Sequence, residues 1–236
     1  MLIGQVFASC VVVGLTVLQA AVADLQTPSH RPHPVDTIAV QKIALLPTSI
    51  PSDVPNHVAG RQILDSLIQA VLARSGFEIV PPDAVEPVWR RLADSVRGFY
   101  DPATGKLNAD KLAAVSGAAA RELGAWGILH PRVGVIPVKY QGGKRVEYDG
   151  VTEGVTSARG EGVVGALTMI VVVFDSSGVA VQCGRGGIQL LAKGTTWNQS
   201  VVPVKPEKVF TDTARDVTAV ERAFGGLLHH EPTCEP

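Results

Sequence analysis

The sequence predicts a single α/β domain, in which helices pack on one mixed β-sheet of about four to six strands. The first observation behind this prediction is a strand–helix–strand unit in residues 42–82. The second is an apolar strand in residues 163–174, which turn residues at 175–178 connect to another strand, as in an antiparallel pair. The expected order of elements over residues 38–228 is β-α-β-α-α-β-β-β-β-α.

The opening unit begins with a nearly continuous apolar run in residues 39–46, which is typical of a strand covered on both faces. Gly76 suits the left-handed end of the helix that follows, and residues 77–80 predict a return strand parallel to the first. The helix itself is indicated by apolar residues at helical spacing, namely Ile63, Leu64, Leu67, Ile68, Val71 and Leu72.

Two more helices are expected before the chain returns to the sheet. One spans about residues 83–95, and the other spans 108–123, with Asn108 as its N-cap and Gly124 at its end. Residues 126–129 then predict a short strand.

A β-hairpin is expected over residues 132–152, with its turn at residues 142–143. Pro137 inside its first arm indicates a sheet edge or a bulge. The charged residues of this segment favour a soluble hairpin over one that inserts into a membrane. These are Lys139, Lys144, Arg145, Glu147 and Asp149.

The last strands surround a glycine-rich segment at residues 184–187. Its backbone amides and Arg185 could hold an anion, but a strand follows it rather than a helix N-terminus. We therefore expect a β-bulge or kink between strands 179–183 and 188–191. The final helix is expected to face inward with Val217, Val220 and Phe224.

Composition excludes one class of function. The net charge of −1 provides no field for nucleic acid, and the 5% aromatic content offers no stacking platform for single strands. With 46% hydrophobic and 18% charged residues in a chain of 236, the sequence predicts one globular core.

Residues 1–23 contain no charged residue and resemble a secretory signal peptide, with a small-residue cleavage site at 21–23 before Asp24. The usual Lys or Arg ahead of the apolar run is missing. An uncleaved membrane anchor is the alternative, since the apolar run approaches the length of a spanning helix.

The segments on either side of the domain carry little patterning. Residues 24–37 predict a proline-rich linker, and residues 229–236 a short tail. His30 and His33 lie in the linker without a cluster of Cys, Asp or Glu, so no metal site is expected.

Removal of residues 1–23 leaves two cysteines, Cys183 and Cys234. An even pair in an exported chain predicts one disulfide between the last strands and the tail. Two unpaired thiols are the alternative.

No motif for catalysis or for a cofactor is found. The sequence has no Gly-x-Ser-x-Gly, and the loop at residues 47–56 has no glycine for a dinucleotide. That loop follows the first strand, where open α/β sheets bind ligands, so Ser49, Asp53 and His57 are candidate binding residues. A solvated loop is the alternative.

The order of these elements resembles a bacterial envelope superfamily. Its members include the N-terminal domain of TolB, the curli secretion channel subunit and the lipoprotein activators of penicillin-binding proteins. The resemblance rests on the strand ending at Leu46-Pro47, on residues 74–80 and 123–128, and on the turn at 175–178. It implies a non-enzymatic α/β module that works in the cell envelope through protein contacts.

The leading hypothesis is therefore an exported, periplasmic envelope domain that binds a protein partner or scaffolds an assembly. Under this hypothesis we expect no enzyme activity and no cofactor. We expect membrane contact only through residues 1–23, if they are not cleaved. The alternative is a periplasmic protein that binds a small ligand with the loop around Ser49, Asp53 and His57. A hydrolase that uses His57 or His130 is the third hypothesis.

Overall fold

The computed structural model describes residues 41–100, 107–142, 145–155, 160–194 and 201–228. The predicted signal peptide, linker and C-terminal tail lie outside these residues, as do His30, His33 and Cys234.

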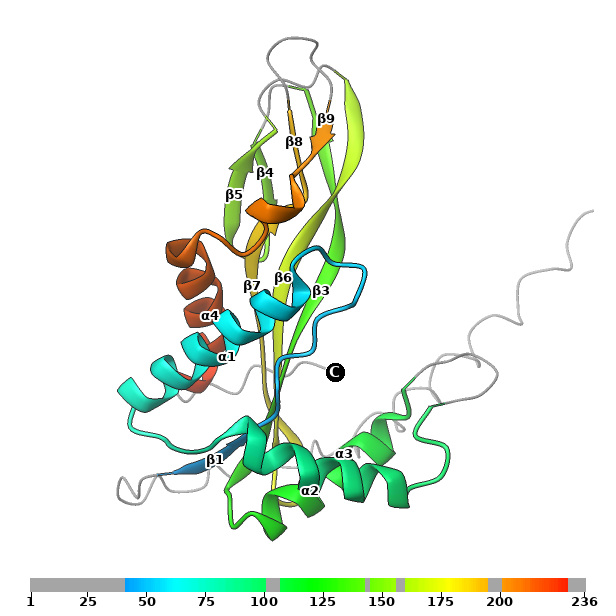
Figure 1. The fold of residues 1–236 in the computed structure, drawn as a ribbon, viewed down its shortest axis with the longest axis vertical. Coiled ribbons are helices and arrows are strands. Elements are labelled where there is room, and N and C mark those ends of the chain that lie inside the picture. Colours follow the sequence, from blue (N-terminus) through cyan, green and yellow to red (C-terminus); the bar gives the residue numbers. More distant parts are fainter. Residues whose placement is uncertain (1–40, 101–106, 143–144, 156–159, 195–200, 229–236) are drawn as a thin grey trace, which may run out of the picture. The chain divides into compact units, whose positions relative to one another are not determined.

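One mixed sheet of five strands forms the centre of the described fold, in the order β2-β1-β3-β6-β7 (Figure 1). β1 (Lys42–Leu45) pairs in parallel with β2 (Glu78–Val80) and with β3 (Gly127–Gln141). β3 then pairs antiparallel with β6 (Glu161–Asp175), and β6 with β7 (Ala180–Leu190). The predicted fold class is confirmed.

Two helices cover one face of this sheet. α1 (His57–Arg74) and α4 (Thr213–Leu228) share a buried cluster with the strand residues Leu129 and Met169. α1 ends as expected, because Gly76 takes a φ of 84° and the Phe77 N–H donates to the Leu72 carbonyl at 3.1 Å. We call this side of the sheet the α1/α4 face.

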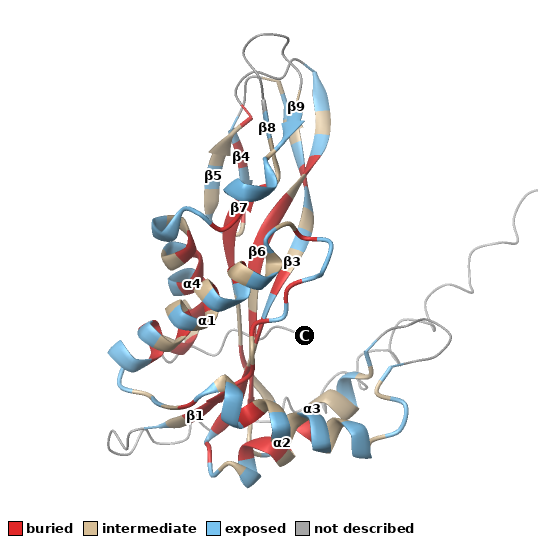
Figure 2. Cartoon of the chain, viewed as in Figure 1, coloured by how far each residue is buried: buried red, intermediate tan, exposed pale blue. Residues whose placement is uncertain are grey.

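The opposite side is covered by two other groups of elements. Successive strand residues point to opposite faces, so Ile128 and Phe174 lie on the other side from Leu129, where α2 (Pro82–Ser95) and α3 (Ala109–Glu122) bury them. Farther along the same side, a hairpin of β4 (Arg145–Tyr148) and β5 (Val151–Gly154) packs on Val138 and Val164. Figure 2 shows buried residues along the strands between these layers.

The end of the chain adds a second small pair of strands before α4. β8 (Ala192–Gly194) and β9 (Val201–Pro203) pair antiparallel, and the short 3-10 helix η1 (Pro206–Lys208) follows.

The predicted hairpin over residues 132–152 is wrong. β3 is one strand of 15 residues that pairs with β6 along its whole length, while β4 pairs with β5 instead. The Ser49 N–H donates to the Pro131 carbonyl, so the backbone of Pro131 faces away from β6. Pro131 and Pro137 occupy positions of the same parity, so neither removes a hydrogen bond from the β3–β6 ladder. The strand therefore continues where the sequence suggested a break.

The glycine-rich segment lies within one strand, β7, rather than between two. A Cβ on Gly184 would lie 1.8 Å from the Ala223 carbonyl oxygen, and one on Gly186 would lie 2.0 Å from that of Ala219. These glycines therefore allow α4 to lie directly against β7. A register shift follows directly, because Thr168 pairs with Gly187 and Leu167 with Gln189, which leaves Ile188 of β7 as an extra residue. The expected β-bulge therefore lies at the end of the glycine-rich segment.

Candidate functional site

The loop with Ser49, Asp53 and His57 is held to the sheet mainly by its backbone. The Ser49 N–H donates to the Pro131 carbonyl at 3.0 Å, and the Val133 N–H donates to the Ser49 carbonyl at 2.8 Å. Ser49 and Asp53 are exposed, and His57 begins α1. Within the described residues, no hydrogen bond or ion pair joins the three side chains, so they do not form a preassembled site.

The same loop contains a polar contact that the sequence analysis missed. The buried Thr48 donates to Asp65 Oδ1 twice, from its backbone N–H at 2.8 Å and from its hydroxyl at 2.5 Å. Asp65 lies on α1, so this contact ties the loop after β1 to the helix. No local signal identifies the pair, because 17 residues separate the partners.

The most connected polar cluster fastens the β4–β5 hairpin to its neighbours. Glu153 Oε2 accepts hydrogen bonds from the Tyr148 hydroxyl at 2.9 Å and from the Leu190 N–H at 3.2 Å, and it pairs with Arg215 at 2.8 Å. Burial and the nearby Glu153 carboxylate raise the pKa of Tyr148, so its hydroxyl stays a donor. The hairpin is thereby joined to both β7 and α4.

A second contact holds the tip of the same hairpin. Asp149 has a φ of 39°, and Gly150, with a φ of 78°, completes a turn typical of two-residue hairpins. The Asp149 carboxylate accepts from the Thr168 hydroxyl at 2.5 Å and pairs with Arg185 Nε at 3.3 Å. Arg185, considered above for anion binding, therefore has an internal carboxylate partner.

His130 occupies a structural position in the layer beneath α2 and α3. Its ring lies edge-on to Trp89 and Phe174, with centroids 4.7 and 5.3 Å away, and burial lowers its pKa to about 3. The Ser116 hydroxyl donates to the Leu112 carbonyl at 2.7 Å, so at 3.0 Å it accepts from His130 Nε2. This bond assigns the proton of the neutral ring to Nε2.

Asp216 is the least satisfied polar group of the described chain. It lies in the first turn of α4, is 1% exposed, and its Oδ2 has no hydrogen-bond partner among the described residues. Burial raises the pKa of Asp216 to about 6, Asp212 adds to the increase and Arg215 opposes it.

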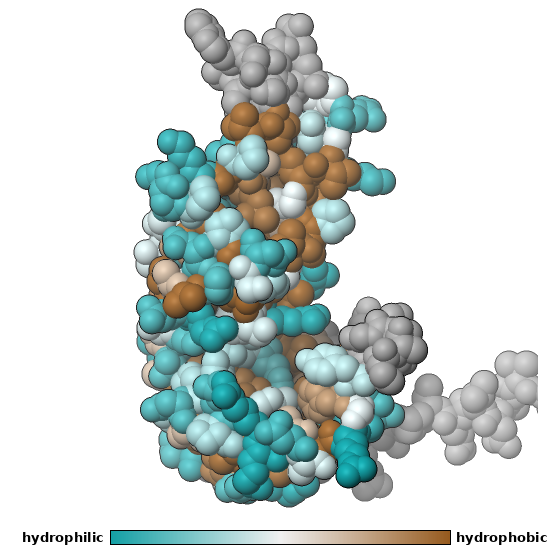
Figure 3. Space-filling view, turned by 45° about the vertical axis from the view of Figure 1, so that its right-hand side comes forward, coloured by the Kyte–Doolittle hydropathy of each residue, from teal (hydrophilic) through white to brown (hydrophobic). Residues whose placement is uncertain are grey.

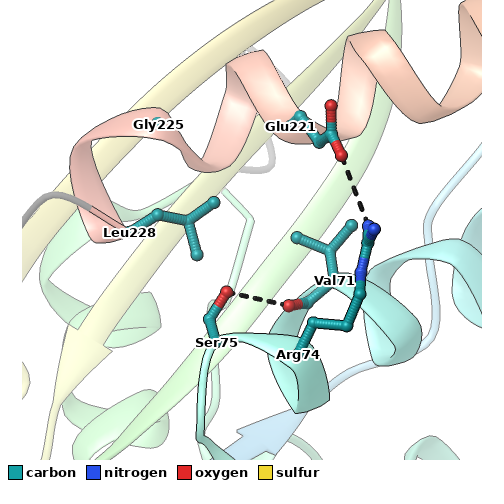
Figure 4. A pocket seen from close by; sticks show the side chains of 6 residues that line it. All are labelled: Val71, Arg74, Ser75, Glu221, Gly225 and Leu228. Carbon is teal, nitrogen blue, oxygen red and sulfur yellow. Dashed lines mark hydrogen bonds and ion pairs between the residues drawn. The ribbon is translucent and has the colours of Figure 1, made fainter.

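A shallow open depression of about 300 Å³ lies where the ends of α1 and α4 meet (Figure 4). Arg74 and Glu221 form an ion pair across it at 3.3 Å, and the Ser75 hydroxyl donates to the Val71 carbonyl. Its volume is at the lower end for ligand pockets, and Ser49, Asp53 and His57 do not line it.

Over the described ranges, no group of three or more His, Cys, Asp or Glu residues could hold a metal ion. Among the same residues, no helix is long and apolar enough to span a membrane. Cys183 lies on β7, and its predicted partner Cys234 is outside the described residues, so the disulfide stays a prediction.

Exposed apolar side chains gather on the far half of the sheet. Val135, Val163 and Val202 are 47%, 60% and 40% exposed. The β3–β6 register places Val135 and Val163 on the α1/α4 face. Val202 points to this side as well, because its neighbour Val201 packs against the cluster on the opposite side. Val135 and Leu191 meet over Gly165. A Cβ placed on Gly165 would lie 3.3 Å from the Val135 side chain and 3.4 Å from the Leu191 side chain. Figure 3 shows apolar residues over this half of the molecule. We call Val135, Val163, Leu191 and Val202 the distal apolar surface.

No protein family model and no curated protein matches this chain. A solved structure of a PelC dodecamer from Paraburkholderia phytofirmans is similar at a TM-score of 0.30 and 14% sequence identity. The similarity covers 78% of this chain and 88% of that one. At these values it assigns neither a family nor a function, so the resemblance to the TolB superfamily stays a prediction.

Proposed function

We propose that this chain is an exported, non-enzymatic α/β domain of the bacterial cell envelope that acts by binding another protein. The observation that supports this function is the distal apolar surface. Three valines there are exposed on one face, at the end of the sheet that α1 and α4 leave uncovered. Exposed apolar clusters of this kind are typical of protein contact sites.

The polar clusters support the same proposal, because they are engaged in holding elements together. Glu153 joins the hairpin to β7 and α4, Asp65 joins α1 to the loop after β1, and His130 bonds to Ser116. A catalytic group needs an open position facing a substrate.

The envelope location rests on residues 1–23, whose apolar run and small-residue cleavage site are typical of an exported chain.

Affinity capture from envelope extracts tests the proposal. Full-length protein should recover a specific partner, and Val135→Lys with Val163→Lys should abolish recovery by placing charges in the contact. Val58→Lys is the matched control, because Val58 is 62% exposed but lies on α1. A partner recovered equally well by all variants, or no specific partner at all, would contradict the proposal.

A further inference from the structure

The outer edge of β3 changes character halfway along the strand. Its first half is covered, because β1 pairs with Gly127–Leu129 and the loop after β1 continues as far as Val133. From Gly134 to Gln141, no strand of the described chain pairs with this edge, while the other edge pairs with β6 throughout (Figure 1).

The hydrogen bonds of the covered half show which backbone groups face outward. Pro131 accepts from the Ser49 N–H, and the Val133 N–H donates to the Ser49 carbonyl, so odd-numbered residues of β3 point away from β6. The β3–β6 register has no shift, and the alternation therefore continues to the end of the strand. Val135 and Lys139 thus present an N–H and a carbonyl at the edge, and Pro137 presents a carbonyl.

We propose that this edge, Val135 to Lys139, binds an extended segment of the partner protein as an added β-strand. The inference rests on the proposed function and specifies how the partner is held. Main-chain hydrogen bonds at a free strand edge supply affinity for extended peptides, and alternate side chains supply selectivity.

The side chains beside the edge define the chemistry of the partner segment. Val135 is 47% exposed and offers an apolar contact on the α1/α4 face. Lys139 is exposed on the same face, and no ion pair within the described residues engages it. The expected partner strand has apolar residues at alternate positions and, on that same face, a carboxylate at the end that meets Lys139.

The other edges of the sheet are less suitable. β2 has three residues and is followed by two prolines, and on β7 the Gly187 N–H already donates to the Asp149 carbonyl. A second copy of β3 is a poor occupant, because it would bring another Pro137 without a donor and a second set of cations to the edge. The segment at residues 24–37 contains three prolines that likewise lack donors.

Amide hydrogen exchange of the full-length protein, followed by NMR, tests the edge directly. In the free protein, the Val135 and Lys139 amides should exchange rapidly, whereas the Ile136 and Val138 amides, bonded to β6, should exchange slowly. Protection of Val135 and Lys139 that is lost on dilution would assign the edge to a second copy. Protection that persists on dilution would assign it to another segment of this chain. Either result overturns the proposal.

The probe is the peptide Glu-Thr-Val-Thr-Val-Thr-Glu, in which the valines and both glutamates lie on one face. Its addition should protect the Val135 and Lys139 amides, and the same peptide with alternate N-methyl groups should not. Absence of protection by the unmodified peptide would overturn the proposal.

Substitution of one outward amide separates this inference from the proposed function. Lys139→Pro removes the outward N–H of residue 139 but none of the hydrogen bonds between β3 and β6. The midpoint of thermal unfolding of this variant should therefore match that of the parent protein. Its affinity for the probe should fall about three- to tenfold, the effect of one hydrogen bond. Lys139→Gln, which keeps the amide, controls for the charge.

The captured partner provides the last comparison. If Val135→Lys abolishes capture while Lys139→Pro binds the partner as well as Lys139→Gln does, a protein contact exists but strand addition is wrong. If neither substitution affects capture, the proposed function fails as well.

Discussion

Gly184 and Gly186 determine how closely α4 approaches β7. Each lies where a side chain would meet a helix carbonyl oxygen at 2.0 Å or less, on Ala223 and Ala219 respectively. Here the requirement is for space, since neither glycine has a positive φ. Backbone, rather than a flexible side chain, fills that space.

We predict that Gly186→Ala lowers the free energy of unfolding by about 3 kcal/mol, because strand and helix must separate to admit the methyl group. Gly225→Ala is the control. Gly225 lies within α4 with no atom within 4 Å of a Cβ, and alanine there should stabilise the protein by roughly 0.5–1 kcal/mol. Urea unfolding measures both. A Gly186→Ala variant as stable as the parent would contradict the close contact.

Asp216 gives a second prediction at this scale. Its pKa is about 6 in the folded chain against 3.8 for an ordinary Asp, so between these pH values the folded state keeps a proton that the unfolded state has lost. The free energy of unfolding therefore decreases as pH rises through this window. Above pH 6, the buried carboxylate lowers stability by about 3 kcal/mol.

Asp216→Asn removes this titration. The stability of the variant relative to the parent should increase by up to about 3 kcal/mol between about pH 4 and pH 7. Urea unfolding across this range measures the difference in the free energy of unfolding between variant and parent. An effect of the amide that does not depend on pH leaves the slope of this difference against pH unchanged. A difference that does not change with pH would contradict the raised pKa.

At the scale of elements, the β4–β5 hairpin depends on polar contacts made with Glu153. Tyr148 and Arg215 would both lose their acceptor in a Glu153→Ala variant. We expect a loss of about 2–4 kcal/mol, since Glu153 is only 15% exposed and its partners are left unpaired.

The matched control for that prediction is Glu221→Ala. Glu221 is 49% exposed and pairs with an Arg74 that is 65% exposed, so its removal should cost less than about 1 kcal/mol. Chemical denaturation of the two variants compares them. Equal losses would mean that the cluster around Glu153 contributes no more than a surface ion pair.

The elements with local signals are those that the sequence predicted well. Asn108 accepts from the Lys111 N–H as an N-cap, and Asp175 Oδ1 accepts from the Ser177 and Val179 amides in the predicted turn. The partner of β3 was not predictable in this way. Whether it pairs with β4 or β6 depends on side-chain packing from distant residues, and β4 offers only four residues against fifteen.

The candidate sites were less predictable than the fold. Ser49, Asp53 and His57 were selected by their position after the first strand, but among the described residues no hydrogen bond or ion pair joins their side chains. The Glu153 cluster assembles residues from β4, β5, β7 and α4, so only the folded chain brings them together. The exposure of Val135 and Val163 depends likewise on where α1 and α4 end on the sheet.

At the scale of the whole molecule, the predicted disulfide would close a loop of about 50 residues between Cys183 and Cys234. A cross-link of this span stabilises a protein by about 4 kcal/mol in the chain-entropy model. Peptide mapping of the purified protein without reductant should recover the two cysteines in one linked fragment. Recovery of both as alkylated thiols would contradict the pairing, and Cys183→Ser would then leave the stability nearly unchanged.

The parallel pairing of β1 has a consequence for the order of folding. β6 and β7 are joined by a turn of a few residues, so they can form within microseconds of collapse. β1 must instead find β3 across the whole segment that contains α1, β2, α2 and α3, and closing so long a loop is entropically costly. We therefore expect the antiparallel strands to form the folding nucleus, and β1, the first strand of the described residues to leave the ribosome, to be the last to join the sheet.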